Sequence, residues 1–196
     1  MLVPNLAAAA WLWLPLAGAP QEPTLPSARL AELVARHDER APGSFDRLVA
    51  ELSALGPSAI PAMLDALRDR AIQPAEGERV ALAAEPAAAV HGALAQLGLD
   101  GVLPALGERL GPGASPLDRA VAVEVLGRIG TAAELGLIVA AGNLTPDEQG
   151  LDPRLDRALY EALTRLFSRS SAAALAAREE LLAAPPHLAA SLARAL

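Results

Sequence analysis

Apolar side chains recur along this chain every three or four residues, which is the spacing of amphipathic helices. Leu30, Leu33 and Val34 follow Ser27 in this way, and comparable runs continue almost to the C-terminus. Glycine and proline separate the runs, and Ser27 and Ser44 stand where helix N-caps are expected. No segment alternates apolar and polar residues for long enough to predict a strand. The pattern therefore predicts an all-α protein.

The helical pattern also repeats itself. A shift of 42 residues places Phe45–Gly56 on Ala87–Gly98, with apolar on apolar at every core position except His91. Further shifts of 32 and 37 residues reach a third and a fourth copy. The first helices of these units share one inner leucine position, occupied by Leu52, Leu94, Leu126 and Leu163. We therefore predict four helix–turn–helix units at about 44–70, 86–110, 115–142 and 152–184, and a possible partial unit at 187–196.

Two stretches resemble a known family. Asp118–Gly130 is similar to the first helix and turn of a bacterial HEAT repeat, and Leu55–Leu64 is similar to the turn and second helix. The resemblance covers 44–184 and is weakest in the fourth unit. It implies an α–α superhelix, or solenoid, in which each unit contacts only its neighbours. The repeat domain would span 27–196, with 27–40 as a capping helix; a compact bundle and a coiled coil are the alternatives.

The N-terminus is typical of a targeting segment. Residues 1–21 hold no charged side chain, and residues 6–14 form an unbroken apolar run. Pro15 ends this run, and Ala17 and Ala19 supply the small side chains that a signal peptidase requires. The pattern predicts a signal peptide at 1–19, a proline-rich linker at 20–26 and an exported protein, periplasmic or extracellular. An uncleaved segment that tethers the chain to a membrane is the alternative, since no basic residue precedes the apolar run.

Composition excludes several functions. The chain of 196 residues carries a net charge of −7, which argues against a nucleic-acid binder. It has no cysteine, so disulfides, thiolate nucleophiles and cysteine-bound zinc are impossible. All 16 basic residues are arginine, so a phosphate-binding loop that requires lysine is excluded as well.

Candidate chemistry is sparse. The three histidines lie far apart in the sequence, and His91 takes a core position, which favours a buried and hydrogen-bonded side chain. The acidic residues Asp147, Glu148, Asp152 and Asp156 lack the spacing of a calcium loop. Asp152 instead predicts the start of the fourth unit as an N-cap. We predict no catalytic site, no cofactor and no metal.

A binding surface is the remaining possibility. In HEAT arrays the second helices line the concave side, where partners usually bind. Three of the aromatic residues, Phe45, Tyr160 and Phe167, occupy core positions, so an interface anchored by aromatic side chains is not expected. The outward positions of the second helices give these candidates: Asp65, Arg68, Asp69, Glu108, Arg109, Glu134, Arg178 and Glu179.

The sequence thus predicts a non-enzymatic scaffold that binds a protein or peptide, with no nucleic acid as partner and no membrane span once the signal is removed. A HEAT-like enzyme of the lyase type, or an accessory of one, is one alternative. The other is a structural segment of a larger assembly.

Overall fold

The computed structural model describes residues 25–74, 77–143, 152–183 and 186–195, apart from several side chains in the last two helices. This part of the chain is mostly helical, so the predicted all-α class is confirmed. The predicted signal peptide, residues 20–24 of the linker, and Asp147 and Glu148 lie outside the described residues. The helices are α1 Pro26–Ala35, α2 Ser44–Ser53, α3 Ile60–Asp69, α4 Ala84–Leu97, α5 Leu99–Leu110, α6 Pro116–Ile129, α7 Leu135–Asn143, α8 Pro153–Arg169, α9 Ser171–Ala183 and α10 Pro186–Ala195, with 3₁₀ turns at Pro57–Ala59 and Ala132–Glu134.

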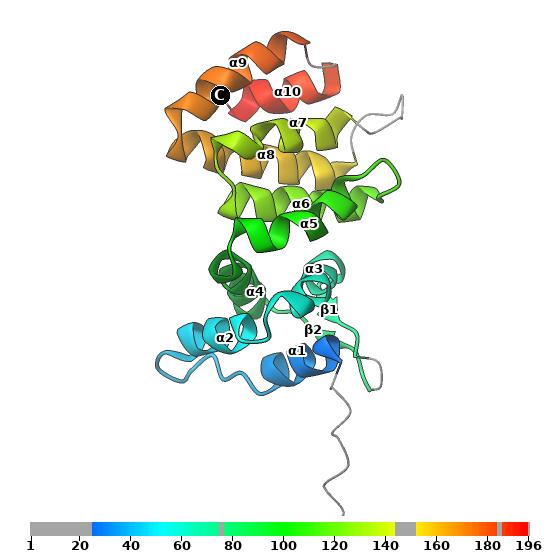
Figure 1. Cartoon of the computed structure of the whole chain (residues 1–196), viewed down its shortest axis with the longest axis vertical. Coiled ribbons are helices and arrows are strands. Elements are labelled where there is room, and N and C mark those ends of the chain that lie inside the picture. The colour runs from blue at the N-terminus through cyan, green and yellow to red at the C-terminus, as the bar shows by residue number, and fades with distance from the viewer. Residues whose placement is uncertain (1–24, 75–76, 144–151, 184–185, 196) are drawn as a thin grey trace, which may run out of the picture.

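The helices follow one another along the long axis of the molecule, from α1 at one end to α9 and α10 at the other (Figure 1). α2 packs along α4, and α6 packs along α8. The second of these crossings requires a glycine, because a Cβ on Gly127 would lie 2.5 Å from the Cα of Ala162. Between α4 and α5 the chain bends by 117° at Gly98. The helix direction therefore changes in the middle of the molecule.

The inner leucine position behaves as the repeat predicts. Leu52, Leu94, Leu126 and Leu163 are all fully buried in one continuous apolar core. Gly56, predicted to end the helix before it, has a φ of +74°, a conformation that favours glycine. The register of the apolar face was therefore read correctly from the sequence.

Several local predictions were wrong. Ser27 and Ser44 are not N-caps: α1 begins at Pro26, whose fixed φ suits a first helical position, and α2 is preceded by the left-handed Gly43. A short antiparallel hairpin, β1 Ala71–Ile72 with β2 Val80–Ala81, lies where no strand was predicted. Two residues in each strand are too few to give an alternating pattern.

Two aromatic residues also depart from their predicted core positions. Phe45 is 38% exposed, because Ala88, Gly92 and Ala95 beside it on α4 are too small to cover its ring. Tyr160 is exposed to a similar degree, with the guanidinium of Arg194 5.6 Å from its ring centre. The helical register predicts which face of a helix a residue lies on. It does not predict whether the neighbouring side chains are large enough to bury that residue.

The N-cap predicted for the fourth unit is confirmed. The carboxylate of Asp152 accepts hydrogen bonds from the backbone N–H groups of Arg154 and Leu155, and Pro153 takes the first helical position of α8. α10 occupies the predicted partial unit and packs against α8 and α9.

No single helix in the described ranges is both long and apolar enough to cross a bilayer. α4 and α5 meet that criterion of length and composition only as a bent pair.

Candidate functional site

Four of the eight predicted binding residues come together with Asp118 in what we term the paired cluster: Asp65, Arg68, Asp69, Arg109 and Asp118. Arg109 donates to Asp65 Oδ1 at 2.8 Å and to Asp118 Oδ1 at 2.9 Å. Arg68 donates to Asp69 at 2.8 and 3.0 Å and to Asp118 at 3.2 Å. The cluster joins α3, α5 and α6, and its charges satisfy one another.

The pKa values in the paired cluster reflect this mutual pairing. The hydrogen bond to Asp69 raises the pKa of Arg68, and the same bond lowers the pKa of Asp69. Burial alone would raise the pKa of Asp118, but the hydrogen bonds from Ser115 and Arg68 outweigh it and lower that pKa. Two predicted binding arginines therefore serve to hold helices together.

The other predicted residues have separate surroundings. Glu108 is exposed beside the cluster and lines the same open depression of about 310 Å³ as Arg68 and Arg109. Glu134 accepts from the backbone N–H of Thr131 at 2.6 Å, within a capping box. Glu179 is exposed on α9, and the side chain of Arg178 lies outside the described part.

A larger cavity, which we term the arginine cleft, has a separate lining. Its volume is about 490 Å³, and α4, α6, α8 and the residue that follows α3 form its walls. Four arginines, two glutamates, one histidine and five alanines line it: Arg70, Arg128, Arg154, Arg157, Glu124, Glu161, His91, Ala84, Ala87, Ala88, Ala120 and Ala158. The cleft thus belongs to first helices of the predicted units, whereas the sequence had indicated the second helices.

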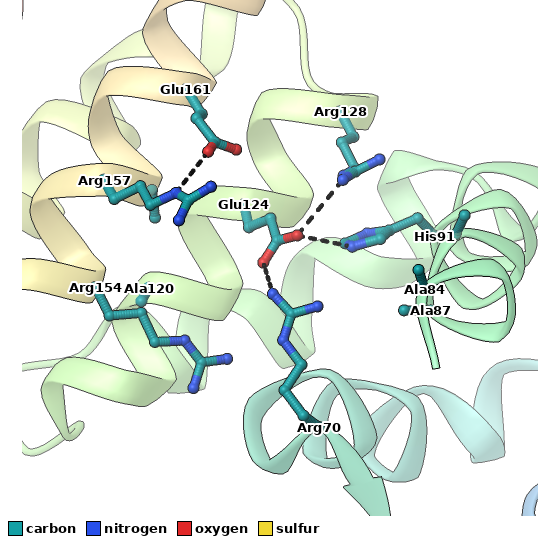
Figure 2. Close-up of a pocket in the computed structure, with 12 residues that line it drawn as sticks. Arg70, Ala84, Ala87, His91, Ala120, Glu124, Arg128, Arg154, Arg157 and Glu161 are labelled. Carbon is teal, nitrogen blue, oxygen red and sulfur yellow. Dashed lines mark hydrogen bonds and ion pairs between the residues drawn. The ribbon is translucent and has the colours of Figure 1, made fainter. Parts of the chain in front are cut away.

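Glu124 of α6 lies at the centre of the cleft. Its Oε1 is 3.1 Å from His91 Nε2 and 3.5 Å from Arg128 Nη2, and its Oε2 is 3.7 Å from Arg70 Nη2. Figure 2 shows Arg70 and Arg128 reaching toward this carboxylate, whereas Arg157 contacts Glu161. Burial alone would raise the pKa of Glu124, but the hydrogen bond from His91 and the charges of Arg70 and Arg128 hold it at about 2.

His91 is buried, as its core position predicted, with 5% of its side chain exposed. A carboxylate can only accept, so the hydrogen on His91 lies on Nε2, which donates to Glu124. Nδ1 is then an acceptor, and it is buried without a hydrogen-bond partner among the described residues. Burial lowers the pKa of His91 below 6.5, so the imidazole is neutral at pH 7.

The two arginines of α8 are held in different ways. Arg154 donates to the carbonyl oxygens of Leu67 and Arg68 at 3.0 and 2.7 Å, which caps the C-terminal end of α3. Arg157 is 81% exposed and donates through Nε to Glu161 at 2.9 Å. Arg154 is therefore a structural part of the wall, whereas the Nη groups of Arg157 remain open to a ligand.

Arg70 and Arg128 have spare donors too. Their guanidinium groups lie 3.5–3.7 Å from Glu124 and make no hydrogen bond to any described residue. The cleft is lined by four guanidinium groups and two carboxylates, and His91 is neutral, so its net charge is +2. The chain as a whole carries a net charge of −7. The cleft can therefore hold an anionic group, because guanidinium groups bind carboxylate and phosphate with pairs of hydrogen bonds.

Sequence reasoning missed the arginine cleft. One signal was available: a shift of 37 residues relates Glu124 and Arg128 to Glu161 and Arg165. The same pair of charges thus recurs on the first helices of successive units. No group of three or more His, Asp or Glu side chains in the described ranges is placed to hold a metal ion.

Comparisons with models of protein families, with curated proteins and with solved structures found no match to this chain.

Proposed function

We propose that this protein is a non-enzymatic scaffold module that binds a protein or peptide partner, and that the arginine cleft is part of its binding surface. The observation that carries the proposal is a set of unused hydrogen-bond donors: those of the Arg70 and Arg128 guanidinium groups and the Nη groups of Arg157 make no hydrogen bond within the described chain. Unused charged donors on the wall of a 490 Å³ cavity are suited to bind a ligand more than to hold a fold together.

The architecture proposed for this module is a HEAT-like solenoid of about four repeats with α1 as its N-terminal cap. Its support is the recurrence of the buried leucine in α2, α4, α6 and α8, together with the packing of α2 along α4 and of α6 along α8. Each unit then contributes one helix to each side of the array, and a ligand can contact several units at once.

We further propose that the module acts outside the cytoplasm. The apolar run at 6–14 and the small residues Ala17 and Ala19 support export. A scaffold without cysteine would function there without disulfides.

Arginine-dependent capture tests the proposed function. The full chain, tagged at its C-terminus, is expressed in its native host beside the double variant Arg70→Gln/Arg128→Gln and the control Arg29→Gln/Arg47→Gln. The control removes the partly buried Arg29 from α1 and the exposed Arg47 from α2, so that the net charge changes equally. We expect one protein that the wild type and the control retain and the cleft variant loses. Equal recovery of every protein by all three chains would overturn the proposal.

A further inference from the structure

A second cavity adjoins the arginine cleft. Its volume is about 470 Å³, and Ala88, His91 and Arg128 line both cavities. The two cavities therefore adjoin one another across α4 and α6, and we refer to them together as the depression. Its cationic part is the arginine cleft, and we term the second part the apolar cavity.

The apolar part of this cavity is formed by the exposed ring of Phe45 together with Ala88, Gly92, Ala95 and Ile129. Polar residues line the rest of the cavity, among them Arg128, Arg165, Ser168 and Arg169. Small side chains opposite a partly exposed ring leave room for one apolar side chain of a ligand. Gly92 is small for a structural reason, since a Cβ there would lie 3.0 Å from a methyl group of Val49 on α2. Exposed aromatic rings beside a cavity are frequent anchors of binding energy.

Arg70 provides an independent sign that the cationic part binds a ligand. Its backbone has a φ of +51° at the C-terminal end of α3, a left-handed conformation in which glycine is the usual residue. An arginine at this position is strained, and strained residues concentrate at functional sites. The strain places a guanidinium group on the wall of the cleft, where it faces Glu124.

The chemistry of the depression favours one class of occupant, an acidic segment of a protein. Nucleic acid presents a long row of phosphates, which the acidic remainder of a chain of charge −7 repels. A small inorganic anion would use the arginines but leave the apolar cavity empty. A peptide that carries carboxylates and one apolar side chain matches both parts of the depression.

We propose that the arginine cleft and the apolar cavity together bind an acidic peptide segment of a partner protein, with its carboxylates on Arg70, Arg128 and Arg157 and one apolar side chain against Phe45. This inference rests on the proposed function and names the chemistry of the partner. Glu124 and Glu161 face the same arginines, so the carboxylates of the ligand bind to the outer donors that these two residues do not use.

Fluorescence polarisation with labelled peptides tests the inference on the full chain. The probes are short peptides in which glutamates flank one leucine at varied spacing. Matched probes have every glutamate replaced by glutamine, or the leucine replaced by serine. A labelled single-stranded oligonucleotide is a further probe. We expect binding of the acidic leucine peptides that falls with added salt, because screening weakens ion pairs.

Variants locate the binding. Arg157→Gln and Phe45→Ala are each expected to weaken binding of the acidic leucine peptide by about tenfold, since each removes one charged or aromatic contact. Their controls are Arg47→Gln on α2 and Leu137→Ala on α7, which change an exposed arginine and an exposed apolar residue outside the depression. Thermal melts of all four variants ensure that a loss of binding is not a loss of fold.

Three results would overturn the inference: equal binding of the glutamine peptide, binding of the oligonucleotide in place of the peptide, or no binding of any peptide. Each leaves the proposed function to be judged separately by arginine-dependent capture. A partner that is captured through Arg70 and Arg128 without an acidic segment would refute the peptide chemistry alone.

Discussion

The paired cluster and the arginine cleft both bring arginines close to carboxylates, yet they differ in how the arginine donors are used. In the paired cluster, Arg68 and Arg109 each donate to two carboxylates at 2.8–3.2 Å. In the cleft, Arg70 and Arg128 share one carboxylate at 3.5–3.7 Å. The number of arginines does not separate a structural network from a binding surface, but the number of unused donors does.

The neighbours Arg68 and Arg70 show this contrast within three residues of sequence. Arg68, in the last turn of α3, has two aspartates within hydrogen-bond distance. Arg70, beyond the helix end, faces only a carboxylate that His91 already occupies. Substitutions in the two regions should therefore affect different measurements.

Acidification should produce the largest effect, through Glu124. A carboxyl whose pKa falls from 4.5 to about 2 on folding contributes about 3 kcal/mol to the free energy of unfolding above pH 4.5. That contribution is lost as the pH falls from 4.5 toward 2. His91 acts in the same direction, because its pKa is lowered and protonation below pH 6.5 favours the unfolded chain. Urea unfolding at a series of pH values measures the slope of the free energy of unfolding against pH.

The variant Glu124→Gln distinguishes the contribution of Glu124 to this pH dependence from that of the other carboxylates. The variant should be less stable at pH 7 and should lose less stability between pH 4.5 and 2. It should also bind the acidic peptide more tightly, since the net charge of the cleft rises. Glu161→Gln, whose partner Arg157 is exposed, is the matched control and should change the slope less. Parallel profiles for wild type and Glu124→Gln would refute the role given to Glu124.

Asp118→Asn should have the next largest effect, and only on stability. Asp118 accepts from Arg68 and Arg109, and the side chain of Arg109 is 14% exposed, so water replaces the lost partner poorly. We expect a loss of about 1–2 kcal/mol in the free energy of unfolding. Binding of the acidic peptide should stay unchanged. A loss of binding as large as that of Arg157→Gln would show that the paired cluster belongs to the binding surface.

The sequence could predict the core because burial follows local periodicity. Leu52, Leu94, Leu126 and Leu163 recur at one register, and a helix that buries one of them must bury the residues three and four positions away. The burial of His91 was predicted for the same reason. Its contact with Glu124, 33 residues later, was not, because that distance depends on how α4 and α6 pack.

The candidate site was only half predictable. The second-helix register identified Arg68 and Arg109, but their partner Asp118 lies on a first helix, 50 and nine residues away. The arginine cleft is formed only because Arg70 and Arg157 line the same cavity, and their proximity depends on the turns between α3 and α8. The periodicity of a sequence does not determine the distance between residues that lie far apart along the chain.

Arg70→Gly should have the smallest effect on stability. It should stabilise the protein, whereas Glu124→Gln and Asp118→Asn should destabilise it. A left-handed backbone costs an L-residue roughly 1–2 kcal/mol, and glycine avoids this cost. Glycine also gives the unfolded chain more conformational entropy, which offsets part of the gain. The free energy of unfolding should therefore rise by about 0.5–1 kcal/mol. It also loses the guanidinium group, so the acidic peptide should bind about tenfold more weakly. Arg70→Gln is the control, because it removes the charge but keeps the strained backbone. It should match Arg70→Gly in affinity and be less stable than both Arg70→Gly and the wild type, because the charge of Arg70 helps to hold the pKa of Glu124 low. If Arg70→Gly gained stability without losing affinity, Arg70 would be a strained helix end and not a ligand contact.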